Sequence, residues 1–387
     1  MQIITITAAF LVLLFIIGKV YDKRWSDHFE AALRFNVAGA FEGEKVKLVE
    51  TVTNRKWLPL PWVHIKFMIS TNIGFAGDKD DEAKPNAGLQ SDNYYRDDLF
   101  SVIMFQRIVR THECVCKKRG YYFINRIDVV SSNIFASKKY VRKLESNAAI
   151  AVYPKRAPIY DFPDIYRRIS GSVIARRHIY PDPFEFRGIR EYERTDPLKT
   201  VNFKAAAKTG ALMTNVYNNT VSQEVAIILN LQKYLAWSSE SVMERAISMA
   251  AAIAEDMIAD GVPVSFVTNG RDVITNENIE IQSGSGGGHL TAIYESMARI
   301  SYAERLTPLS ARLGEIISAA DKEPVYIIIS TYCESDLREK FNEMTGLGFE
   351  AYWFIPVLAP DAAILKVDEF TTDVIIKCEV SEYDGRV

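Results

Sequence analysis

Apolar and polar side chains alternate along much of the first 155 residues. The stretches 44–52 and 62–67 both follow this pattern. A period of two places every second side chain on the same face of a strand, so each stretch predicts a strand with one buried face. Turn-forming residues at 54–56 and 59–61 separate the two stretches. Short strands at this spacing predict a small β-sandwich over residues 28–155.

The pattern changes after residue 223, where apolar positions become continuous. Residues 225–229, 325–329 and 351–355 are apolar runs, as expected of strands that are buried on both faces. The residues between these runs carry apolar side chains at helical spacing. Strands that alternate with helices predict a parallel α/β layer fold over residues 223–387.

The amino terminus carries a third pattern, a long apolar run. Residues 3–20 are apolar apart from threonines, a glycine and Lys19. A helix of this length spans most of a bilayer core, so residues 1–22 are predicted to be a transmembrane anchor. No basic residue precedes the run, whereas Lys23 and Arg24 follow it. This asymmetry predicts a single-pass protein of the cell membrane with the bulk of its chain in the cytoplasm.

Composition and cysteine content narrow the function classes. The 387 residues carry a net charge of -3, and the basic residues are dispersed among carboxylates, so nucleic acid is not predicted as a partner. Cys114 and Cys116 form a C-x-C pair that faces one side of a predicted strand. A metal site would need two more ligands, and His112 alone is a poor candidate. We therefore interpret the four cysteines as reduced thiols and predict no cofactor.

The most distinctive segment, residues 186–208, interleaves basic and acidic side chains with aromatic residues. Its candidate binding or interdomain residues are Arg190, Tyr192, Asp196, Lys199, Phe203 and Lys208. A balanced set of charges around large apolar groups is typical of a salt-bridged clamp between domains. The same residues also suit a docking face for an anion or a partner. Both interpretations are kept, with the clamp favoured.

This segment resembles the signature of the bacterial domain-of-unknown-function family 58. That signature reads roughly Arg-x-Tyr-x-x-Gly-Asp-x-x-Arg-x-Ile-x-Trp-x-x-Ser-Ala-Arg. The chain departs from it at Thr195, where glycine is usual, and at Phe203, where tryptophan is usual. The resemblance implies a signature and linker region over residues 156–222. It also implies an α/β von Willebrand factor A-like domain preceded by an immunoglobulin-like β-sandwich and one N-terminal transmembrane helix.

Domains of the von Willebrand factor A type often hold a divalent cation through Asp-x-Ser-x-Ser and residues of later loops. The corresponding positions of this chain are Asn230, Gln232, Tyr234, Gly288 and Thr331. These residues lack the carboxylate that a hard cation prefers, so the cation site is predicted to be degenerate and to hold no metal. The glycine-rich stretch 284–288 lacks the Gly-Lys-Ser/Thr of a phosphate-binding loop.

No nucleophile and base stand out along the chain, which favours a non-enzymatic function. We predict a membrane-anchored scaffold or adaptor, and the family resemblance implies a MoxR-type AAA+ ATPase as its partner. One alternative is a ligand- or metal-binding adhesion module. Another is an enzyme that acts on an anionic substrate through the central Arg/Asp cluster.

Overall fold

A computed structural model describes residues 2–75, 93–132, 138–155, 181–193, 196, 198–219, 224–233, 240–302, 306–319, 324–358 and 371–379. The chain divides into two compact units. The first unit comprises Met1–Lys155 with Gly385–Val387, and the second comprises Arg156–Asp384. Each unit is described by itself.

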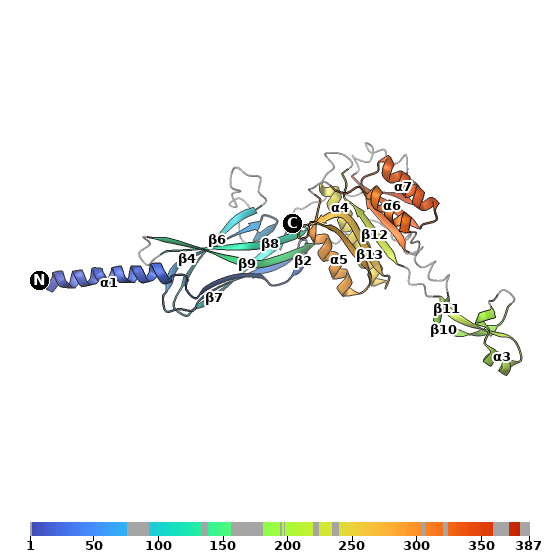
Figure 1. The fold of residues 1–387 in the computed structure, drawn as a ribbon, viewed down its shortest axis with the longest axis horizontal. Helices are drawn as coiled ribbons and strands as arrows, with labels where there is room; N and C mark the ends of the chain where they lie inside the picture. The colour runs from blue at the N-terminus through green and yellow to red at the C-terminus, as the bar shows by residue number, and fades with distance from the viewer. Residues whose placement is uncertain are drawn as a thin grey trace. The chain divides into compact units, whose positions relative to one another are not determined.

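Two sheets pack face to face in the first unit (Figure 1). The four-stranded sheet is antiparallel, with the order β1 (Phe29–Phe35), β3 (Lys45–Asn54), β7 (Arg107–Cys116) and β5 (Ile73–Phe75). The five-stranded sheet has the order β2 (Gly39–Phe41), β9 (Lys139–Tyr153), β8 (Gly120–Ser132), β4 (Leu60–Ser70) and β6 (Asn93–Val102). Only β2 and β9 are parallel among the neighbouring strands of this sheet.

The core of the first unit follows from the alternation in its strands. Val46, Leu48 and Val52 of β3 are buried, and the alternate residues Lys47, Val49 and Thr51 are more exposed. The buried side chains of both sheets form one apolar cluster, to which Phe67 of β4 belongs. Glu50 occupies the next inward position of β3 and is also fully buried. A carboxylate inside an apolar cluster needs hydrogen-bonding or charged partners.

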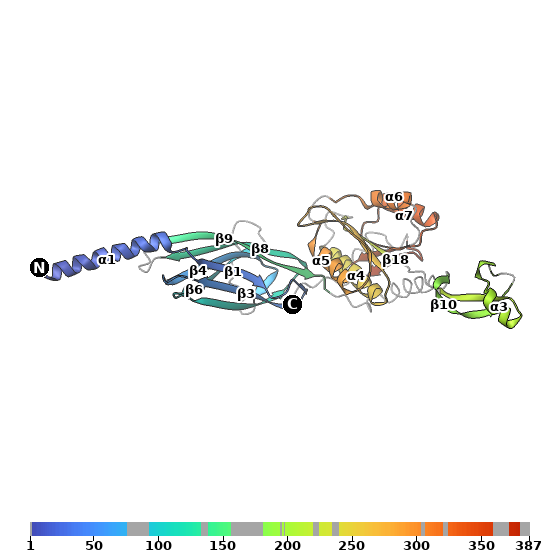
Figure 2. The ribbon, with the colours of Figure 1, turned by 60° about the horizontal axis from the view of Figure 1, so that its bottom comes forward.

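The apolar amino-terminal run forms helix α1 (Gln2–Arg24), and its last turns belong to the sandwich (Figure 2). Tyr21 and Trp25 are buried in the core of the first unit. Asp22 pairs with Lys138 at 2.7 Å and accepts a hydrogen bond from Tyr140. The apolar run therefore continues into a helix end that the folded sandwich uses for packing.

None of the helices in the described ranges is long and apolar enough to cross a membrane. The prediction of a transmembrane anchor over residues 1–22 is therefore wrong, and so is the single-pass cell-membrane localisation that was built on it. The prediction rested on composition and included Tyr21 in the membrane span. In the structure, Tyr21 and the nearby Trp25 pack inside the sandwich.

The signature segment of the second unit folds into a hairpin. Strands β10 (Pro181–Glu191) and β11 (Met213–Asn219) are antiparallel. Between them lie the 3-10 turn η2 (Leu198–Thr200) and helix α3 (Phe203–Thr209). The Asn202 side chain caps α3 by accepting from the Ala205 amide at 2.9 Å, and Gly210 ends the helix at a φ of 74°.

In the described residues, the rest of the second unit is a seven-stranded sheet with four helices. Its main path runs β14 (Asn278–Gly284), β13 (Val264–Asp272), β12 (Val225–Asn230), β16 (Val325–Ser330), β17 (Ala351–Val357) and β18 (Ile375–Glu379). The short strand β15 (Ile300–Ser301) pairs with β13. The helices are α4 (Glu240–Ala259), α5 (Gly287–Arg299), α6 (Leu309–Ala319) and α7 (Ser335–Gly346). The five strands from β13 to β18 along this path are parallel, whereas β14 and β15 run antiparallel to β13.

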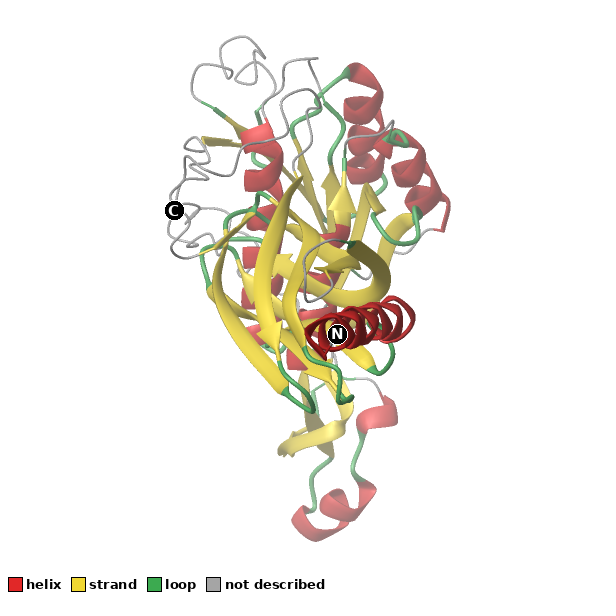
Figure 3. Cartoon of the chain, turned by 90° about the vertical axis from the view of Figure 1, so that its left-hand side faces the viewer, coloured by secondary structure: helices red, strands yellow, loops and turns green. Residues whose placement is uncertain are grey.

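The predicted fold class, with its von Willebrand factor A-like α/β domain and transmembrane helix, is wrong for this chain. Strands hold 47% of the described residues and helices 28%, so the chain is β-rich with several separate sheets (Figure 3). The apolar runs identified buried strands but gave no sign of the antiparallel strands β14 and β15. Half-polar strands of this kind resemble loops in composition, so the prediction underestimated the strand content.

Candidate functional site

Three residues of the signature lock the turn of the β10–β11 hairpin. Arg190 donates two hydrogen bonds to Asp196, from Nη2 to Oδ1 at 2.6 Å and from Nη1 to Oδ2 at 2.8 Å. Asp196 also accepts from the Glu193 amide at 2.9 Å, and the Tyr192 hydroxyl donates to the Asp196 carbonyl at 3.1 Å. The Arg190 hydrogen bond lowers the pKa of Asp196 and raises that of Arg190. The structure thus brings Arg190, Tyr192 and Asp196 together.

The other predicted residues of the signature point to solvent. Phe203 begins α3 with 75% of its surface exposed, and Leu198 of η2 is 77% exposed. Lys199 and Lys208 are exposed, and neither pairs with a carboxylate in the described part of the chain. Thr195 lies outside the described residues. The clamp interpretation expected Phe203 to be buried, whereas the hairpin presents it at the surface.

At the carboxyl ends of the parallel strands, Asn230 is the centre of a buried amide network. Its Nδ2 donates to the Ser330 Oγ at 2.9 Å, and its Oδ1 accepts from the Asn269 Nδ2 at 2.7 Å and the Gln232 amide at 3.1 Å. The Ser330 hydroxyl in turn donates to the Tyr332 carbonyl at 2.9 Å. Each polar atom of the Asn230 side chain therefore has a protein partner.

The remaining positions of the expected cation site are divided between two edges of the sheet. The Gln232 side chain has a protein partner, since its Oε1 accepts a hydrogen bond from the Leu309 amide at 2.9 Å. Thr331 is buried beside Ser330, with an Oγ1 that has no hydrogen-bond partner within the described ranges. Gly288 instead lies at the start of α5, where His289 Nε2 is 2.7 Å from the carbonyl of Val264, the first residue of β13. Tyr234 lies outside the described residues.

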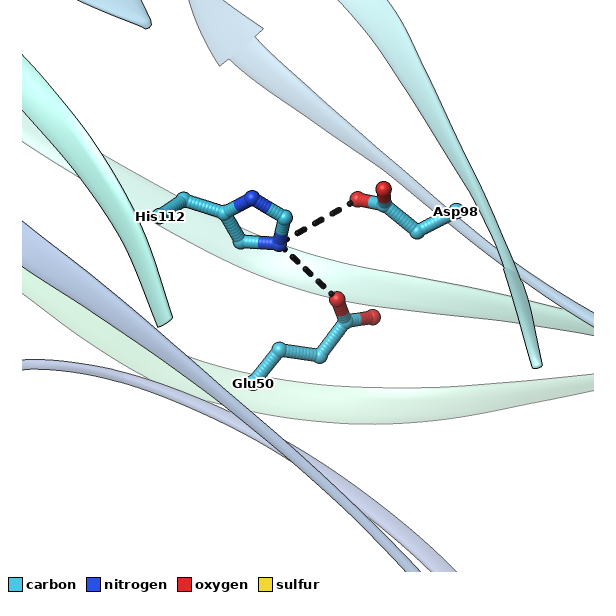
Figure 4. A group of neighbouring side chains, drawn as sticks. All are labelled: Glu50, Asp98 and His112. Atoms are coloured by element: carbon cyan, nitrogen blue, oxygen red, sulfur yellow. Dashed lines mark hydrogen bonds and ion pairs between the residues drawn. The ribbon is translucent and has the colours of Figure 1, made fainter. Parts of the chain in front are cut away.

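A group that the sequence did not reveal lies between the sheets of the first unit. Glu50 of β3, His112 of β7 and Asp98 of β6 direct their side chains at one another (Figure 4). His112 Nε2 is 3.2 Å from Glu50 Oε2 and 3.6 Å from Asp98 Oδ2. Glu50 and Asp98 are buried, and burial is the main cause that raises the pKa of Glu50.

Two arginines contact this group, and one of them, Arg96, fixes the tautomer of His112. Arg96 donates from Nε to Asp98 Oδ2 at 2.9 Å and lies with Nη2 3.2 Å from His112 Nδ1. A guanidinium can only donate, so Nδ1 accepts and the imidazole proton is on Nε2. That proton points at Glu50 and Asp98. Arg110 adds a hydrogen bond from Nη1 to Asp98 Oδ1 at 3.2 Å.

The side chains of this group fit a network of ion pairs and hydrogen bonds better than they fit a metal centre. A cation would have to displace the Nε2 proton of His112 and lie beside two guanidinium groups. The Asp98 carboxylate already pairs with Arg96 at 2.9 Å and with Arg110 at 3.2 Å. The rings of Phe75 and Phe100 cover these arginines, with each guanidinium carbon 4.1 Å from a ring centroid. The group joins the two sheets.

No model of a known protein family matches the chain, and no curated protein sequence matches it. Solved structures share short parts of it. A CARDB domain from Pyrococcus furiosus, in complex with di-metal ions, is 11% identical, covers 33% of this chain and 94% of its own, and has a TM-score of 0.21. A beta-glucosidase from Listeria innocua, in complex with gluconolactone, is 12% identical, covers 32% and 16%, and has a TM-score of 0.18. At such low scores these likenesses assign neither a fold family nor a function.

Proposed function

We propose that the chain is a non-enzymatic scaffold or adaptor that binds a protein partner through its β10–β11 hairpin. The family resemblance of the signature suggests a MoxR-type AAA+ ATPase as that partner. The observation that carries the proposal is the pair of exposed apolar side chains, Leu198 and Phe203, on a segment with a rigid turn.

Leu198 and Phe203 lie on adjacent short elements, η2 and α3, and Leu212 near β11 is also more than half exposed. Apolar side chains gathered on one small element are typical of a binding surface, since each would gain by leaving water. Lys199 and Lys208 add positive charge that an acidic partner surface would complement. The bidentate contact of Arg190 with Asp196 restricts the turn that precedes these residues, and any such restriction lowers the entropic cost of binding.

The nucleophiles of the described residues also favour a binding role. Each of the four cysteines is buried. Burial raises the pKa of Cys116 to about 12, that of Cys333 to about 11 and that of Cys378 to about 12. A thiol with a raised pKa is a poor nucleophile at neutral pH. The amide network around Asn230 is engaged within the protein and offers no obvious base.

The test is capture of a purified MoxR-type ATPase by the immobilised full chain. We expect Phe203→Ser and Leu198→Ser each to weaken binding by about tenfold, because each removes a contact worth about 1.4 kcal/mol or more. Ile274→Ser is the matched control, since Ile274 is exposed but lies in the β13–β14 turn. If both hairpin variants bind the ATPase like the parent chain, the hairpin is not the docking surface and the proposal is wrong.

A further inference from the structure

A groove of about 890 Å³ lies on the outer face of the five-stranded sheet in the first unit. It crosses strands β6, β4, β8 and β9, which lie side by side (Figure 2). The register of β8 and β9 shifts between Ile124 and Arg126, and this bulge strengthens the local twist of the sheet. Side chains that face outward from these strands form much of its lining. They include Lys66, Met68, Tyr95, Tyr121, Phe123 and Arg126.

Aromatic rings are the first notable feature of this groove. Tyr95 on β6 is 53% exposed, and Phe123 on β8 is 49% exposed. The rings of Tyr121 and Phe123 lie with centroids 6.3 Å apart at an angle of 44°. In the strand register, Tyr95 lies level with Met68 of β4, whereas Phe123 lies beyond Ile127, where the pairing of β8 with β4 ends. The rings therefore stand on separate strands and at separate levels of the groove. Exposed rings in a concave site are suited to cover the apolar face of a ligand.

The charges of the groove nearly cancel. Arg126 pairs with Asp128 at 3.0 Å, and Lys66 pairs with Asp97 at 2.9 Å. Lys143 and Glu145 add one charge of each sign. A polyanion such as nucleic acid would therefore find little net attraction here. A neutral ligand does not depend on a net charge in the groove, so the balanced charges do not oppose its binding.

Uncommitted polar groups surround the rings. The side chains of Asn93, Asn125, Lys143 and Glu145 make no hydrogen bond or ion pair within the part of the chain that the structure describes. Together they offer amide donors and acceptors, an ammonium and a carboxylate. A ligand with many hydroxyl groups could satisfy both donors and acceptors of this kind.

We propose that this groove binds a neutral oligosaccharide, with sugar rings stacked on Tyr95 and Phe123 and hydroxyl groups bonded to the surrounding amides and charged side chains. Stacking uses the apolar faces of the sugar rings, and aromatic rings on two separate strands can hold more than one sugar ring. This site is separate from the hairpin of the proposed function, so either proposal can fail without the other.

Calorimetric titration of the full chain tests the site with cellohexaose, chitohexaose, maltohexaose and an anionic heparin hexasaccharide. We expect at least one neutral hexasaccharide to bind, and Tyr95→Ala and Phe123→Ala each to weaken that binding about tenfold. Trp57→Ala is the matched control because Trp57 is an exposed aromatic residue outside the groove. The variants change exposed side chains, and circular dichroism confirms that each still folds.

Three outcomes overturn the proposal. The first is that no neutral hexasaccharide binds, including the case in which only the heparin fragment does. The second is that Tyr95→Ala and Phe123→Ala bind like the parent chain. The third is that Trp57→Ala loses as much affinity as the two groove variants, which would place the binding elsewhere.

Discussion

Replacing Asn230 by aspartate is a stringent test of the network at the carboxyl edge of the seven-stranded sheet. The substitution hardly changes the size of the side chain, but it replaces the donor Nδ2 by an acceptor oxygen. That oxygen would face the Ser330 Oγ, which now accepts from Asn230 at 2.9 Å. Ser330 can supply the missing proton only by giving up its hydrogen bond to the Tyr332 carbonyl. In either arrangement the variant has one buried hydrogen bond fewer.

The expected loss of stability follows from these contacts. Asn230 is fully buried, so the variant loses one buried hydrogen bond and gains a carboxylate without a cationic partner among the side chains described around it. The oxygen that accepts from Asn269 and Gln232 keeps both bonds, which reduces the penalty. Together these effects predict a destabilisation of about 2 to 4 kcal/mol.

Native-state hydrogen exchange of the full chain, read by mass spectrometry, measures this loss locally. Exchange of the β12 and β16 amides should become about 30- to 900-fold faster at neutral pH, while β3 in the first unit should be unchanged. Asn342→Asp on the exposed face of α7 is the matched control and should leave exchange unaltered. Acid should partly restore the variant, because a protonated acid can donate to Ser330 again.

Two results would refute this reasoning. Parent-like protection of β12 in the Asn230→Asp variant at neutral pH would mean that the amide donor is not needed. Saturable protection by magnesium or calcium in the variant would mean that the edge is a latent cation site rather than an amide network.

Three further predictions concern other parts of the chain. Burial raises the pKa of Glu50, so the contribution of this carboxyl to stability is complete below its unfolded pKa and declines as the pH rises through its folded pKa. Urea melts from about pH 4 to 7 should therefore show the parent chain losing stability relative to Glu50→Gln. A difference in stability that stays constant over this pH range would contradict the prediction. Cys116 and Cys378, with pKa values raised to about 12, should resist iodoacetamide at pH 8 in the folded chain and react in urea, as mass spectrometry can show. Arg190→Ala and Asp196→Ala should each accelerate hydrogen exchange in the β10–β11 ladder without affecting β12, whereas unchanged ladder protection would mean that the pair does not hold the turn.

Local periodicity predicted individual strands well, because burial on one or both faces leaves a direct trace in the sequence. All of the alternating stretch 44–52 except its first residue lies within β3, and the apolar run 225–229 lies within β12, where every residue is buried. The assembly of strands was predicted less well. Antiparallel strands such as β14 have polar, exposed positions, and their composition does not separate them from loops.

The Glu50–His112–Asp98 group shows why the polar site of the first unit was missed. Its members come from three strands and two sheets, so no spacing in the sequence relates them. One local signal was present. Glu50 occupies an inward position of an alternating strand between Leu48 and Val52, where an apolar residue is expected. A charged residue at such a position indicates a buried partner, although it does not say which residue the partner is.

The signature segment illustrates the reverse case, in which residues close in sequence supply their own structure. Arg190, Tyr192 and Asp196 are within seven positions of one another, and Asp196 bonds to both of the other residues. Their charges are satisfied locally, so they are not available to bind a partner. Leu198 and Phe203 are apolar and exposed. The Arg190–Asp196 pair therefore serves conformation, and the exposed residues Leu198 and Phe203 carry the proposed recognition, which is why the docking proposal depends on Phe203 rather than on Arg190.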